Sequence, residues 1–185
     1  MIKRFLELLT PKLYISSLAE VEHDMLAARG IKAVILDLDN TLLPWRDYEI
    51  PPESLAWVER AKEKGVKLFI ASNTHNPKRL RVVAEKLGIP SLDRIAKPRR
   101  KGLRAAMDIM GSTPSTTAMI GDQIFTDIVG GNRLELLTIL VSPLHRREFV
   151  GTKISRLFEK PILAWLTRRG LRGTKGTEGE SEIQD

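Results

Sequence analysis

The 185-residue chain contains no cysteine and few aromatic residues, which make up 5% of it. Without cysteine it can form neither disulfides nor thiolate metal sites, as is common in cytoplasmic proteins. Its longest apolar runs, residues 33–36 and 136–141, fall far short of the roughly 18 residues of a membrane-spanning helix. Charged residues within positions 1–9 argue against a secretory signal peptide. With 42% hydrophobic and 29% charged residues, we expect a globular cytoplasmic protein.

Positive charge is in excess, with a net charge of +7 and a pI near 9.8. The protein should therefore favour anionic partners such as phosphates, anionic lipid headgroups or nucleic acid. Basic residues concentrate in two clusters, residues 94–104 and 145–175. Solvated, solubilising faces are the alternative explanation for both clusters. The low aromatic content offers few stacking platforms for nucleic acid, so nucleic acid is not the favoured partner.

Apolar runs alternate with helical patterns along most of the chain. Strands are predicted at residues 33–36, 66–71, 117–120 and 136–141, with a weaker candidate at 91–96. Helices are predicted at 52–64, at 77–87 after an Asn76 cap, and at 101–110 before Gly111. Ser17 and Glu20 have the spacing of a capping box, which predicts one further helix ending at Gly30. The alternation predicts an α/β fold with a doubly wound, Rossmann-like parallel sheet and helices on both faces.

Ligands of such sheets bind beyond the carboxyl ends of the strands, and polar residues follow four of the predicted strands. They are Asp37 to Thr41, Ser72 to Thr74, Lys97 with Pro98, and Gly121 with Asp122. Asp37 and Asp39 are two residues apart, so both should point to one side of the sheet. A divalent cation would keep such adjacent carboxylates ionised and would attract phosphate. With Asp122 as a third carboxylate from a neighbouring strand, the pattern predicts a Mg²⁺ site.

These motifs, in this order, resemble those of the haloacid dehalogenase superfamily of phosphatases. The matching residues are Asp37-Leu38-Asp39-Asn40-Thr41, Ser72, Lys97-Pro98 and Gly121-Asp122 with Thr126-Asp127. The resemblance implies that Asp37 is a nucleophile that forms an aspartyl phosphate and that Asp39 is the general acid and base. It also implies that Mg²⁺ is bound by Asp37, Asp122 and the main-chain carbonyl of Asp39.

Phosphate-binding and supporting roles follow from the same resemblance. Thr41, Ser72, Asn73 and Lys97 would bind the phosphoryl group, and Asp127 would orient Lys97 or tune the metal site. The alternatives are structural. Ser72 could cap a turn, Lys97 could be a surface charge, and Asp127 could be a helix-start residue.

The spacing leaves no room for a cap domain over the site. Thr41 and Ser72 are 31 positions apart, and Ser72 and Lys97 are 25 apart. An open site suits a phosphate presented by something large, such as a lipid surface, a protein or a nucleic acid. Further similarity, in Gly30-Ile31-Lys32-Ala33 and Ala96-Lys97-Pro98 among other segments, points to a capless group related to phosphatidylglycerophosphate phosphatases. That similarity implies a phosphatidylglycerophosphate substrate.

The predicted organisation has four parts: a helical lead-in (1–30), a catalytic core (31–145), a basic amphipathic helical segment (146–169) and a disordered tail (170–185). The third part has an apolar stripe flanked by basic residues, which would suit a helix lying peripherally on the inner face of an anionic membrane. The alternative is that this helix simply covers the sheet, and Pro161 would kink it. Two rival functions stay open: a phosphatase of proteins, nucleic-acid ends or other soluble phosphates, and a non-catalytic RNA- or ribosome-associated module. No oligomeric state is predicted.

Overall fold

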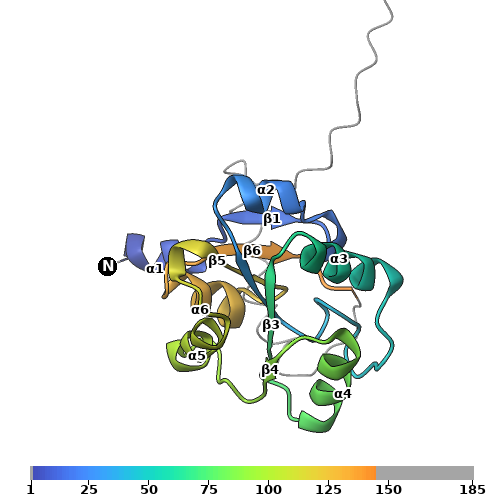
Figure 1. The fold of residues 1–185 in the computed structure, drawn as a ribbon. Helices are drawn as coiled ribbons and strands as arrows, with labels where there is room; N and C mark the ends of the chain where they lie inside the picture. Colours follow the sequence, from blue (N-terminus) through green and yellow to red (C-terminus); the bar gives the residue numbers. More distant parts are fainter. Residues whose placement is uncertain (1, 145–185) are drawn as a thin grey trace, which may run out of the picture.

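A computed structural model describes residues 2–144 and shows a six-stranded, fully parallel sheet with the strand order β1-β6-β5-β2-β3-β4 (Figure 1). The strands are β1 (Leu13–Ile15), β2 (Ala33–Leu36), β3 (Lys67–Ala71), β4 (Ser91–Leu92), β5 (Thr117–Gly121) and β6 (Leu137–Val141). This confirms the predicted doubly wound α/β fold. Four of the five predicted strands are found nearly as expected, and the weak candidate at 91–96 is a strand only at its first two residues.

Both faces of the sheet are buried at its central strands, which explains why these strands are mainly apolar. All four residues of β2 are completely buried. Val34 and Leu36 belong to one hydrophobic cluster, whereas Ala33 and Ile35 belong to another on the opposite face. Side chains alternate between the two faces along a strand, so a central strand must be apolar at every position.

Helices cover each face of the sheet (Figure 1). The first cluster packs the sheet against α2 (His23–Ala28), α3 (Pro52–Glu63) and α4 (Pro77–Leu87). On the other face lie α5 (Arg100–Met110), α6 (Val129–Asn132) and α1 (Ile2–Leu9). Single turns at η1 (Leu18–Glu20) and η2 (Pro114–Thr116) and a π-helical segment, η3 (Ile124–Ile128), complete the described elements.

The three helices predicted within the core are confirmed with shifts of one residue at most. The side chain of Asn76 accepts a hydrogen bond from the backbone N–H of Arg79, so Asn76 caps α4 as predicted. Gly88 and Gly111 adopt left-handed backbone conformations at the ends of α4 and α5. These glycines stop the helices where the sequence placed their ends.

The single helix predicted from Ser17 to Gly30 is wrong. Ser17 contacts the side chain of Glu20 and makes no capping bond to the backbone, so only the η1 turn forms before the chain extends at Val21. A separate short helix, α2, then ends at Ala28, and Gly30 follows it in the left-handed conformation, with a φ of +73°, as expected of the residue after a helix end. Residues 1–30 also contribute β1, which pairs with β6 and was not predicted.

Strand β2 occupies the switch point of the sheet. From β2 the chain moves outward through β3 and β4, then returns to the other side of β2 for β5 and β6. The crevice outside such a switch point is where α/β sheets bind ligands. Between the motif at residues 37–41 and Lys97 lie only a loop, α3, β3, α4 and β4, so the core carries no inserted cap domain.

None of the helices among residues 2–144 combines the length and apolar character needed to cross a membrane. The predictions for residues 146–169 and 170–185 lie outside the described residues.

Candidate active site

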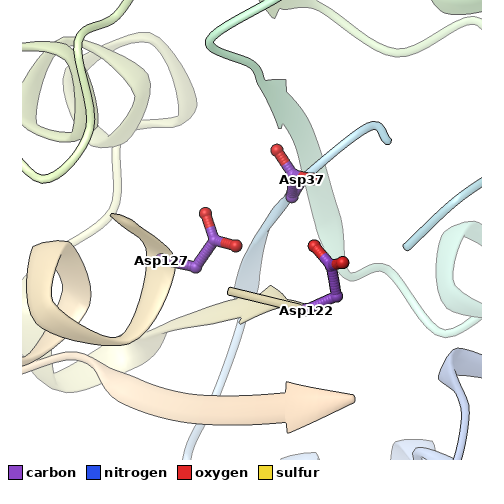
Figure 2. Close-up of side chains that lie close together, drawn as sticks. All are labelled: Asp37, Asp122 and Asp127. Atoms are coloured by element: carbon purple, nitrogen blue, oxygen red, sulfur yellow. The ribbon is translucent and has the colours of Figure 1, made fainter. Parts of the chain in front are cut away.

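The predicted acidic residues come together at the carboxyl edge of the sheet. Asp37 follows β2 and donates its backbone N–H to the carbonyl of Ile120 in β5. Asp122 follows β5 directly. Asp37, Asp122 and Asp127 are all buried, and one oxygen from each lies within 4.8 Å of the others (Figure 2). Two segments far apart in sequence, one with Asp37 and one with Asp122 and Asp127, thus supply one cluster of carboxylates.

Lys97 lies inside this cluster. Its ammonium nitrogen lies 2.5 Å from Oδ1 of Asp37 and 2.7 Å from Oδ1 of Asp127. Burial alone would lower the pKa of Lys97, but the charges of Asp127 and Asp37 outweigh this effect and raise the pKa above its usual value. The Lys97 side chain is 2% exposed and charged, so it is not a surface charge. It can neutralise an anion brought to Asp37.

Asp127 is held in place by its surroundings. Its Oδ2 accepts a hydrogen bond from the backbone N–H of Gln123, and burial raises its pKa to about 6 although Lys97 acts in the opposite direction. Gly121 packs directly against this carboxylate, because a Cβ at position 121 would lie 2.3 Å from Asp127 Oδ2. The Gly121-Asp122 motif therefore needs glycine for space.

Asn73 fixes the backbone of Lys97. Its side-chain oxygen accepts from the Lys97 N–H at 2.9 Å, and its amide nitrogen donates to the Lys97 carbonyl at 3.0 Å. One amide hydrogen remains for its predicted phosphate contact. Ser72 is buried, and its Oγ accepts from the Thr74 N–H at 3.0 Å. The Ser72 oxygen therefore caps the turn, as the structural alternative expected, while the hydroxyl hydrogen can still donate to phosphate.

The loop after Asp37 brings a further hydroxyl to the site. Thr41 is 1% exposed, and its Oγ1 has no hydrogen-bond partner among residues 2–144. A buried hydroxyl without a partner is costly, so a ligand oxygen would satisfy it. The backbone N–H of Asn40 donates to the Leu43 carbonyl at 2.8 Å and is used within the loop.

The donor set fits a divalent cation. Carboxylate oxygens are the ligands that Mg²⁺ prefers, and those of Asp37, Asp122 and Asp127 are close enough to share one ion. Among the described residues, Lys97 contacts Asp37 and Asp127, and Arg79 contacts Asp39.

Arg79 is the site residue that the sequence reasoning missed. It is 3% exposed, and it donates to Oδ1 of Asp39 at 2.6 Å. Burial and the charge of Asp37 raise the pKa of Asp39, whereas Arg79 opposes this rise. A signal was present: Arg79 precedes Val83 and Leu87 at helical spacing, which places a charge on the buried face of α4.

A buried carboxylate paired with lysine at the switch point of a parallel sheet is typical of a phosphate-binding class of site. Comparison with known proteins supports this class. Residues 44–134 match the haloacid dehalogenase-like hydrolase family. Over 170 residues the chain is 35% identical to "Probable phosphatase YqeG" of Bacillus subtilis, covering 92% of this chain and 96% of the relative.

A second relative is "Phosphatidylglycerophosphate phosphatase 1, chloroplastic/mitochondrial" of Arabidopsis thaliana, at 32% identity over 88% of this chain. The chain spans about half of that relative, 49% of its length. Among solved structures, the cobalt-bound deoxy-D-mannose-octulosonate 8-phosphate phosphatase of Haemophilus influenzae matches with a TM-score of 0.51 and 17% identity, covering 77% of this chain and 91% of that one. An uncharacterized Listeria monocytogenes protein matches with a TM-score of 0.53 and 18% identity, covering 75% of this chain and 99% of that one. Both likenesses concern the fold.

The chain belongs to the haloacid dehalogenase-like hydrolase family. Within that family it is a phosphatase.

Proposed function

We propose that the protein is a Mg²⁺-dependent phosphomonoesterase that acts through an aspartyl phosphate on Asp37. The observation that carries this proposal is the buried contact between Lys97 and Asp37, within a cluster of carboxylates at the switch point of the sheet. Asp37 would be the nucleophile, and the ammonium of Lys97, 2.5 Å from its Oδ1, provides positive charge where the phosphoryl oxygens would arrive.

The reaction has two steps. An oxygen of Asp37 attacks phosphorus, the bond to the ester oxygen breaks, and Asp39 gives its proton to the departing alkoxide. Water then attacks the phosphorus of the aspartyl phosphate while Asp39 takes a proton from it, the bond to Asp37 breaks, and inorganic phosphate leaves. Asp37 and Asp39 are both regenerated, so the balance is one ester and one water converted to one alcohol and one phosphate.

The remaining residues bind and orient. Lys97, Ser72, Thr41 and Asn73 would hold the phosphoryl oxygens, and Asp127 would hold Lys97 beside Asp37. The carboxylates of Asp37 and Asp122, with the main-chain carbonyl of Asp39, would hold Mg²⁺. When bound, the ion would neutralise charge on the phosphoryl group.

The proposed substrate is phosphatidylglycerophosphate. Two observations support it: the core has no cap, so a headgroup phosphate at a lipid surface can reach the site, and two relatives carry the name phosphatidylglycerophosphate phosphatase. Such a protein would work in the cytoplasm and act peripherally at an anionic membrane surface.

The test is steady-state phosphate release from an aryl phosphate and from phosphatidylglycerophosphate in mixed micelles, with Mg²⁺ or EDTA. Wild type should release phosphate only with Mg²⁺ and should prefer the lipid by kcat/KM. Asp37→Asn should lose activity to the detection limit, and Asp108→Asn, which changes an exposed aspartate on α5, should keep it. A fully active Asp37→Asn would refute the mechanism, while equal kcat/KM on peptide, oligonucleotide and lipid phosphates would refute the substrate.

A further inference from the structure

Arg79 is a buried cation whose guanidinium is shared between the site and a neighbouring loop. Its NH1 donates to Oδ1 of Asp39 at 2.6 Å, its Nε donates to the carbonyl of Asp47 at 2.5 Å, and its NH2 donates to the carbonyl of Pro44 at 3.2 Å. Only 3% of its side chain is exposed. All three nitrogens are therefore committed to fixed acceptors, and the planar guanidinium imposes one geometry on them.

The loop that Arg79 holds is formed by residues 44–48. It follows Asp39 by five residues, and its end is exposed at Arg46, Asp47 and Tyr48. Further bonds tie it to the same region: the Trp45 N–H donates to Asn40 Oδ1 at 3.3 Å.

We infer that Arg79 is a positioning residue that fixes the carboxyl of Asp39 and the 44–48 loop in one arrangement, so that the acid faces the departing oxygen of the substrate. The inference rests on the proposed role of Asp39. Arg79 does not touch the reacting atoms. It acts through Asp39 by holding one carboxyl oxygen, Oδ1, which leaves Oδ2 to carry the proton that the alkoxide receives.

Two features argue that this contact is more than packing. The acceptors on the 44–48 loop are backbone carbonyls, so Arg79 holds the path of the loop whatever its side chains are. In addition, Arg79 is the first buried residue of α4, and its backbone N–H donates to the side-chain oxygen of the Asn76 cap. A rigid helix end, a cap and three acceptors together leave the guanidinium little freedom, as accurate orientation of a catalytic group requires.

The inference is tested by the dependence of rate on the leaving group. Phosphate monoesters ranging from dinitrophenyl to simple alkyl leaving groups are compared by kcat/KM in wild type, Arg79→Met, Arg79→Lys and Asp39→Asn, with Mg²⁺ present. A dinitrophenolate needs no proton to leave, whereas an alkoxide does. Since a positioned acid contributes about 10²- to 10⁴-fold, Arg79→Met should lose about 10- to 100-fold on the alkyl esters and only a few-fold on the dinitrophenyl ester.

The expected result is a steeper fall of log kcat/KM with leaving-group pKa in both Arg79 variants, in the same direction as in Asp39→Asn. Arg79→Lys keeps the charge but cannot reach three acceptors, so its slope should lie between those of wild type and Arg79→Met. If Arg79→Met does not fold, Arg79→Lys still tests the inference. Arg81→Met, an exposed position on the same helix, is the matched control and should have the wild-type slope.

If the Arg79 variants lost activity equally on all esters and kept the wild-type slope, while Asp39→Asn showed a steeper slope, Arg79 would only stabilise the fold. That result would overturn the inference. If Asp39→Asn also kept the wild-type slope, Asp39 would not be the acid, and the proposed mechanism would fail together with the inference. The two failures are therefore distinguishable in one data set.

Discussion

Replacing Lys97 by methionine removes a buried charge while keeping a side chain of similar length. Lys97 is 2% exposed and lies within 2.7 Å of both Asp37 and Asp127, whose side chains are 8% and 1% exposed. Removing one partner from a buried ion pair costs about 3 to 5 kcal/mol because the remaining charge is left uncompensated. For a chain of this size the melting temperature should fall by roughly 6 to 20 °C.

Thermal unfolding followed by circular dichroism in EDTA measures this loss, and Lys101→Met, an exposed lysine on α5, is the control. The double variant Lys97→Met/Asp127→Asn also removes one of the two carboxylates that Lys97→Met leaves without their lysine partner. It should therefore be more stable than the sum of the single changes predicts, by about 0.5 to 3 kcal/mol. A loss below about 1 kcal/mol for Lys97→Met, or additive effects in the double variant, would contradict the view of Lys97 as the charge that holds this cluster together.

Three further predictions concern packing, pH and metal. Gly121→Ala places a Cβ 2.3 Å from Asp127 Oδ2 and should cost about 1 to 3 kcal/mol in stability together with most of the activity; an unchanged melting curve would contradict this. Burial lowers the pKa of His23 below its usual 6.5, so the unfolded state binds the proton more readily. The contribution of His23 is therefore complete above pH 6.5 and is lost as the pH falls, and the melting temperature of His23→Gln should depend less on pH between 7.5 and 5.5. Mg²⁺ at 100 times its Kd should stabilise wild type by about 2.7 kcal/mol, and the same concentration should leave Asp122→Asn nearly unaffected; equal shifts in both would place the ion elsewhere.

Much of the core could be predicted because its signals are local. Strands β2, β3, β5 and β6 are largely buried on both faces, so each is a mainly apolar run that stands out in the sequence. The helix ends at Gly88 and Gly111 depend on the left-handed conformation that glycine adopts readily. Strand β1 lacked such a signal, because three residues at the edge of the sheet are too short for a pattern.

Local bonding also misled the prediction for residues 17–30. Ser17 and Glu20 have the spacing of a capping box, but their side chains bond to each other. Leu18 and Val21 are buried in the core, and η1 contacts α3, so tertiary packing decides the path of this segment. A short-range pattern cannot predict which partner a side chain will find when the competing partners come from distant segments.

For the site, the sequence by itself determined that Asp37, Asp39, Ser72, Lys97 and Asp122 follow strands of one parallel sheet, and hence that they share an edge. Only the tertiary structure decided how they pair. It placed Lys97 between Asp37 and Asp127, and it brought Arg79 to Asp39 from 40 positions away. Strand order and the burial of each charge decide such contacts. A buried cation must lie where several hydrogen-bond acceptors meet, and these acceptors come together only after the helices have packed on the sheet.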